Sequence, residues 1–190
     1  MAVSCTSHKI REVPAFIFDE SVYRIEKDGV VIGVDPYFDT QTIEDAFHVD
    51  MSKGGFYPIR LRISNLTNER LVIDRGEIYL VADTGDKYAA VSSEDVVKDL
   101  RHNSVAYGLL GFGIFSFMDA EEANAKMKAD WSSKELPLSM FFGRDQAQTG
   151  FVYFRLPENV RPESTTLQVT AEKFTTHTKI TLLARFSARN

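Results

Sequence analysis

The residue types that most often do chemistry do not gather into a recognisable set in this chain. The four histidines lie far apart, at His8, His48, His102 and His177. No pair has the His-x-x-x-His spacing that places two metal ligands on one helix face. His48 could join a carboxylate site with Asp45 and Asp50, but a solvated acidic helix end is the favoured interpretation. His177 stands among threonines, and we expect it in a turn.

One short acidic motif could bind calcium. In Asp83-Thr84-Gly85-Asp86, oxygen donors surround a glycine, which suits a hard cation. Four residues are too few for six or more coordination positions, and the same residue types favour a hairpin turn. A phosphate-binding loop is not predicted either, because Gly108, Gly111 and Gly113 have no neighbouring Lys-Ser or Lys-Thr. We therefore expect neither a metal nor another cofactor.

No nucleophile has surroundings that would activate it. Cys5 is the single cysteine and lies close to the start of the chain, where a fixed base is hard to arrange. The serines lack the Gly-x-Ser-x-Gly motif of a nucleophile elbow. We therefore expect a protein that is not an enzyme.

Composition describes an ordinary globular chain. It has 190 residues, of which 44% are hydrophobic and 26% charged, enough for one sizeable core. The net charge is −5, and lysine and arginine are scattered rather than clustered. Nucleic acid is therefore not an expected partner, since its recognition requires a basic surface. We expect a flexible tether over residues 1–12 and a single domain over residues 13–190.

Most of the chain alternates with the period of β-strands. Residues 59–64 place Ile59, Leu61 and Ile63 on one face and Arg60, Arg62 and Ser64 on the other, which predicts a half-buried strand. Asp28-Gly29 between two β-rich runs predicts a hairpin. Further short strands separated by turn residues are expected over residues 71–91 and 150–186. This pattern predicts a mainly β chain built as an antiparallel β-sandwich of immunoglobulin-like type, with the strand order left open.

Two or three short helices should interrupt the strands. Asp39 precedes a possible helix over residues 40–47, and Ser92-Ser93-Glu94-Asp95 has the residue types of a helix N-terminus. Asp119 could cap a longer helix over residues 120–132, in which Ala123, Met127 and Trp131 recur at helical spacing. The last two helices belong to an insertion over about residues 92–136.

Between these helices lies an apolar, glycine-rich segment. The 16 residues between His102 and Asp119 carry no charge, and as a helix they would span about 24 Å, short of the roughly 30 Å core of a bilayer. The segment could cover an open end of the sandwich as part of the core. It could instead contact a protein or lipid partner. The side chains expected to make that contact are Tyr107, Leu109, Leu110, Phe112, Ile114, Phe115 and Phe117.

The N-terminus has features of a lipid attachment site. Ala2-Val3-Ser4-Cys5 followed by a polar run resembles the end of a bacterial lipoprotein signal, in which the cysteine becomes lipidated. No charged region and apolar region precede Cys5, although an intact secretory signal has both. Cys5 is therefore either the lipidated residue of a processed lipoprotein or an ordinary cysteine.

Longer stretches resemble a known group of proteins. They are the strand region "FYPIRLRISNLTNERLVIDRGEIYLVADTGDKY", the helix "DAEEANAKMKADWSSKEL" and the strand "GFVYFRLPE". Together they are similar to uncharacterised bacterial envelope lipoproteins with an immunoglobulin-like fold. That resemblance implies an address outside the cytoplasm, at the periplasm or outer membrane, and implies no reaction.

These observations predict a non-enzymatic, extracytoplasmic lipoprotein. It would serve as an accessory or scaffold subunit that docks on a protein partner in the cell envelope through the apolar segment, and it could form a homo-oligomer. The membrane contact would be the lipid on Cys5. The alternative is a soluble module that binds a small molecule or a metal, or a small hydrolase, with a pocket beside the sandwich.

Overall fold

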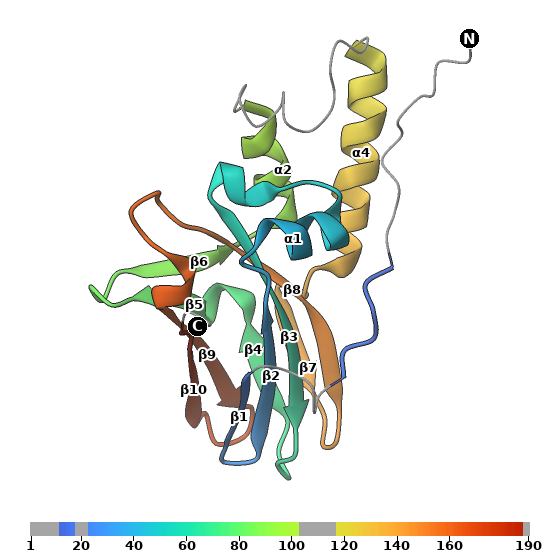
Figure 1. Ribbon diagram of the computed structural model, residues 1–190. Coiled ribbons are helices and arrows are strands. Elements are labelled where there is room, and N and C mark those ends of the chain that lie inside the picture. Colours follow the sequence, from blue (N-terminus) through green and yellow to red (C-terminus); the bar gives the residue numbers. More distant parts are fainter. Residues whose placement is uncertain (1–11, 18–22, 103–116, 188–190) are drawn as a thin grey trace.

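The computed structural model describes residues 12–17, 23–102 and 117–187. These residues form a mainly β protein with three α-helices (Figure 1). The strands are β1 (Tyr23–Lys27), β2 (Val30–Pro36), β3 (Phe56–Asn65), β4 (Leu71–Asp74), β5 (Ile78–Ala82), β6 (Lys87–Val91), β7 (Ser139–Phe142), β8 (Ala147–Arg155), β9 (Thr165–Lys173) and β10 (Lys179–Arg185). The helices are α1 (Thr40–Phe47), α2 (Ser93–His102) and α4 (Phe117–Lys134), and short 3-10 turns are η2 (Met51–Gly54), η3 (Arg75–Glu77) and η4 (Pro162–Ser164).

The strands pair antiparallel in the order β1-β2-β3-β8-β6-β5-β9-β4-β7, with β10 on the other side of β9. Strand β6 connects two halves, because its first residues, 87–89, pair with β5 and its last two, Ala90 and Val91, pair with β8. A buried apolar cluster draws side chains from β2, β3 and β8 in one half and from β4, β5, β9 and β10 in the other. The two halves therefore enclose one core, and the prediction of a mainly β, antiparallel sandwich is confirmed.

Local turn signals also proved correct. Asp28 and Gly29 both have positive φ, 51° and 79°, as a two-residue hairpin turn requires, and they connect β1 to β2. Residues 83–86 connect β5 to β6, where Thr84 Oγ1 donates a hydrogen bond to Asp86 Oδ2 at 2.7 Å. The acidic motif is thus explained by the turn that it forms.

Strand β3 is more buried than its alternation predicts. Ile59, Leu61 and Ile63 face the sandwich core as expected. The opposite face is not left to solvent, because Phe56 packs in a second apolar cluster and Arg60 is only 9% exposed. The Arg60 guanidinium donates to the Pro14 carbonyl at 2.6 Å, so residues 12–17 lie over this face. The prediction of a half-buried strand was therefore wrong for the N-terminal half of β3, because other segments of the chain cover its second face.

The helices agree with the sequence in two cases and differ in one. Asp39 caps α1, whose bounds are those expected, by accepting a hydrogen bond from the Thr42 amide at 2.9 Å. Ser92 accepts from the Asp95 amide at the start of α2. Asp119 is not a cap, because α4 already begins at Phe117 and a capping residue needs a non-helical backbone. Its acidic side chain is equally typical of a first helical turn.

Candidate interaction site and pocket

The structure locates the borders of the predicted contact segment. Tyr107, Leu109, Leu110, Phe112, Ile114 and Phe115 fall in residues 103–116, outside the described residues, as does Cys5. Phe117 is the first residue of α4. The segment thus starts from the C-terminal end of α2 and ends at the N-terminal end of α4. Within the described ranges, no helix combines the length and apolar character needed to cross a membrane.

Helices α2 and α4 pack against each other at one end of the strands (Figure 1). Lys128 on α4 forms an ion pair with Glu94 on α2 at 2.6 Å. Beneath this exposed pair the two helices bury apolar side chains in the second cluster, including Val96, Leu100, Met127 and Trp131. Met127 and Trp131 are four residues apart and fully buried, as expected for one face of α4, and the Ala123 side chain lies outside the described residues.

Aromatic rings connect the helices to the sheet. The Phe47 ring on α1 lies edge-to-face with Phe151 and Tyr153 on β8, at centroid distances of 4.9 and 5.9 Å. The same ring meets Trp131 on α4 at 5.8 Å. Such edge-to-face pairs add to the stabilisation that burial provides. The helical layer is therefore packed directly on the outer face of β8.

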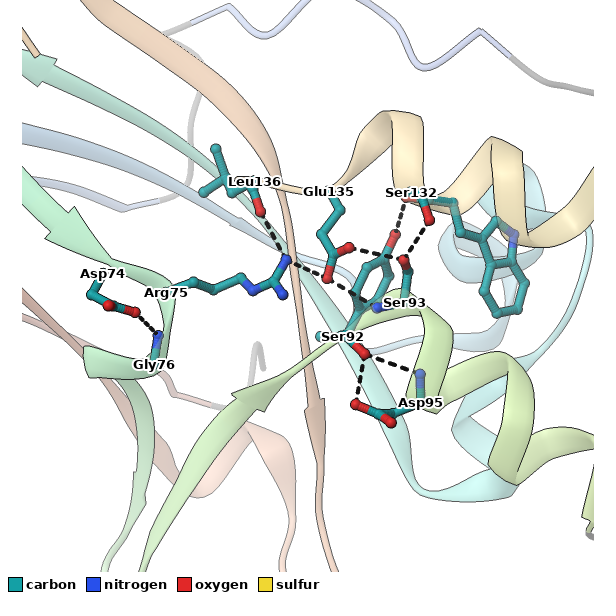
Figure 2. A network of polar contacts seen from close by, with 11 residues as sticks. Asp74, Arg75, Gly76, Ser92, Ser93, Asp95, Ser132, Glu135 and Leu136 are labelled. Atoms are coloured by element: carbon teal, nitrogen blue, oxygen red, sulfur yellow. Dashed lines mark hydrogen bonds and ion pairs between the residues drawn. The ribbon is translucent and has the colours of Figure 1, made fainter. Parts of the chain in front are cut away.

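A single carboxylate ties three segments together (Figure 2). Glu135 follows α4, and its Oε1 lies 2.5 Å from Arg75 Nη1 in η3. The same oxygen accepts a hydrogen bond from the Ser93 amide at 2.9 Å, and Oε2 accepts from the Ser93 hydroxyl at 2.8 Å. The side chains of Arg75 and Glu135 are only 12% and 11% exposed. Glu135 therefore fixes the start of α2 and the end of α4 to the connection between β4 and β5.

A second buried ion pair lies within α4, and its lysine also contacts α1. Lys134 Nζ lies 2.9 Å from Asp130 Oδ2 and donates to the Ala46 carbonyl at 3.0 Å. The side chains of Lys134 and Asp130 are 10% and 0% exposed. The ammonium also lies 5.4 Å from the centre of the Phe47 ring. Breaking a buried pair of this kind is costly, because the remaining charge has no compensation.

Tyr153 and Ser93 lie within this network and have structural rather than catalytic surroundings. Burial raises the pKa of Tyr153 well above its ordinary value, and the carboxylates of Glu135 and Asp130 act in the same direction. The phenol thus stays neutral and donates to the Trp131 carbonyl at 3.2 Å. The Ser93 hydroxyl also contacts Ser132 Oγ at 2.9 Å, but Ser93 is only 1% exposed and offers a substrate no access.

His48 and His177, the two histidines whose side chains the structure describes, lie at the ends of different elements. His48 ends α1 in a left-handed conformation and its amide donates to the Glu44 carbonyl, so it does stand at a helix end. His177 lies between β9 and β10, with positive φ and Nδ1 2.8 Å from Glu172 Oε1, as the expected turn residue. Among the residues described, no three of the types His, Cys, Asp and Glu are placed to hold a metal ion together.

A pocket of about 620 Å³ lies at one end of the sandwich, and sequence reasoning named none of its lining residues as site residues. It lies between η2, the start of β3, β6 and the loop that follows β8. Gly55 has φ of 77°, and a Cβ at this position would lie 2.8 Å from the Leu156 carbonyl oxygen, so the wall is formed by close backbone contact. Six of the lining residues are Lys53, Gly55, Tyr57, Tyr88, Arg155 and Glu158.

Comparisons with known proteins leave the family open. No family model and no curated protein sequence matches this chain. The crystal structure of the yjhA protein from Bacillus subtilis is similar over 88% of this chain and 98% of that chain, with 9% sequence identity and a TM-score of 0.45. The function is therefore proposed from the residues themselves.

Proposed function

We propose that this protein is a non-enzymatic, extracytoplasmic lipoprotein that acts as an accessory or scaffold subunit in the cell envelope. Docking on a protein partner would use the uncharged segment from Tyr107 to Phe117. The observation that carries the proposal is the buried attachment of both bordering helices to the sandwich through Glu135. Glu135 holds the start of α2 and the end of α4, so the segment lies between the opposite ends of two anchored helices and is well suited to present side chains to a partner.

Energetics support this arrangement. Binding costs conformational freedom, and a segment that connects two anchored helices loses less of it on docking than a free chain of the same length. Aromatic and aliphatic side chains supply the large desolvated area that dominates binding energy, and the segment contains Phe112 and Phe115 among its apolar residues.

The docking role predicts the behaviour of a double variant. In envelope membranes, the parent chain should cross-link to a protein partner. Replacing Phe112 and Phe115 with serine should abolish this cross-link, while the melting temperature of the variant stays within a few degrees of that of the parent. The measurement is mass-spectrometric identification of the cross-linked partner together with thermal unfolding. The matched control replaces Phe174 and Leu183, which are 53% and 56% exposed on the β9–β10 hairpin, with serine. Global unfolding of the first variant would show that the segment belongs to the core instead.

If the protein is a lipoprotein, its mass should include a covalently attached lipid. The product of the complete gene, made in its own type of cell, should carry a diacyl or triacyl adduct on Cys5 and sediment with membranes. Replacing Cys5 with alanine should move it to the soluble fraction, since a lipid anchor contributes about 0.8 kcal/mol for each buried methylene group. An unmodified, soluble product would contradict the proposed membrane attachment. The docking role would still be tested separately by the Phe112 and Phe115 variant.

A further inference from the structure

We propose that the pocket between η2, β3, β6 and the loop after β8 binds a small zwitterionic ammonium compound, one that carries a cationic ammonium and an acid group. The pocket is separate from the docking segment in sequence and uses none of its residues. Its volume of about 620 Å³ falls within the ordinary size of small-molecule sites, about 300–1,000 Å³.

The lining carries charges of both signs. Lys53 and Arg155 supply two cations, and Glu158 supplies a carboxylate. The cations are partly neutralised, because Lys53 lies 3.4 Å from Asp50 and Arg155 lies 2.6 Å from Asp99. Glu158 has no ion-pair partner within the part of the chain that the structure describes. A ligand with one group of each sign matches this lining better than a simple anion or a simple cation.

Both cations retain capacity for an acid group. A guanidinium has five N–H donors, and the one hydrogen bond of Arg155 to Asp99 leaves several of them available. The side chains of Lys53 and Arg155 are 47% and 61% exposed, so a ligand reaches them without opening the fold. The acid group would therefore lie beside these two residues, where charge-assisted hydrogen bonds form.

Two tyrosine rings provide a surface for the ammonium end. Tyr57 and Tyr88 line the pocket and are half-buried, and both also pack against the sandwich core. Aromatic faces attract quaternary ammonium groups, and a nearby carboxylate such as Glu158 strengthens the attraction. Burial, followed by the charges of Glu163 and Asp50, raises the pKa of Tyr57, so its hydroxyl remains a neutral donor.

Three isosteric probes test this inference on the full chain. Glycine betaine has both charges, choline keeps only the cation, and 3,3-dimethylbutanoate keeps only the anion. In NMR titrations we expect saturable shifts at Tyr57 and Tyr88 with glycine betaine, and affinity about tenfold weaker for each singly charged probe, in line with the loss of one charge-assisted contact. No saturable binding of glycine betaine, or equal binding of all three probes, would overturn the proposal.

Variants locate the binding in the pocket. Replacing Glu158 with glutamine should weaken glycine betaine binding about tenfold and leave 3,3-dimethylbutanoate binding unchanged. Replacing Arg155 with glutamine should show the reverse selectivity, weakening both probes that carry an acid group and sparing choline. The matched control is Arg185→Gln, which removes another exposed arginine from the end of a strand, where it pairs with Asp83 at 3.5 Å. An Arg185→Gln effect equal to that of Arg155→Gln would place the binding elsewhere and refute the assignment.

Discussion

Replacing Glu135 with alanine is expected to lower the free energy of unfolding by about 3–5 kcal/mol. The change leaves the Arg75 guanidinium buried without its carboxylate, and it removes the two Glu135 oxygens that accept hydrogen bonds from the Ser93 amide and hydroxyl. Urea denaturation measures the loss, followed by circular dichroism and by fluorescence. The fluorescence comes from Trp131, the chain's single tryptophan, which is fully buried in the helical layer.

A matched control separates burial from charge. Glu94 also forms an ion pair, with Lys128 across the α2–α4 boundary, but this pair is exposed to solvent, with the Lys128 and Glu94 side chains 47% and 66% exposed. Glu94→Ala should therefore cost only about 0–1 kcal/mol. If the two alanine variants lose the same free energy, Glu135 does not hold the helices in the way its contacts suggest.

The parts of the fold that were predicted correctly have signals contained within a few residues. Asp39 and the residues after it determine both the cap and the bounds of α1. Asp28-Gly29 provides the left-handed backbone that the β1–β2 turn needs. The alternation of Ile59, Leu61 and Ile63 identifies the face of β3 that meets the sandwich core. Each of these signals depends on short-range sterics and hydrogen bonds, so no distant part of the chain is needed to interpret it.

What was missed depends on contacts between distant segments. The burial of Arg60 follows from the arrival of residues 12–17 over β3, which alternation cannot reveal. Strand β7 has only four residues, and it pairs with β4, which lies far earlier in the sequence. An exposed Phe141 in the middle of β7 also obscures its pattern. Tertiary pairing determines such a short strand more than its own residues do.

The polar network and the pocket share this limitation. Arg75, Ser93 and Glu135 look like ordinary surface residues in the sequence, and they become a buried set only when the β4–β5 connection meets the two helices. Tyr57, Tyr88 and Arg155 come from three different strands and meet only at one end of the sandwich. The close approach of the Leu156 carbonyl explains why a glycine stands at position 55. The sequence alone does not predict this contact, because it forms only on folding.

The two apolar clusters divide the molecule into a sandwich and a helical layer that share β8. Alternate residues of this strand serve the two sides, with Val152 and Phe154 in the first cluster and Phe151 and Tyr153 in the second. A perturbation of the helical layer thus has a direct route to the sheet. Whether the layer can open by itself decides how rigidly the ends of the proposed docking segment are held.

Replacing Trp131 with alanine tests this coupling and is expected to cost about 3–5 kcal/mol, because it leaves a large cavity in the second cluster. Trp131 is fully buried and its ring meets Phe47 at 5.8 Å, so the variant loses this aromatic contact between α4 and α1. Hydrogen exchange should accelerate in α1 and α4 well before it does in β9 and β10.

The comparison for that experiment is Leu182→Ala, which empties part of the first cluster on β10 and is also almost fully buried. Its exchange should accelerate first in β9 and β10, since these strands pair along their length. A uniform acceleration in Trp131→Ala would instead mean that the helical layer and the sandwich unfold as one unit. In that case α2 and α4 are as stable as the sandwich itself, and docking through the segment between them would require no separate ordering of the helices.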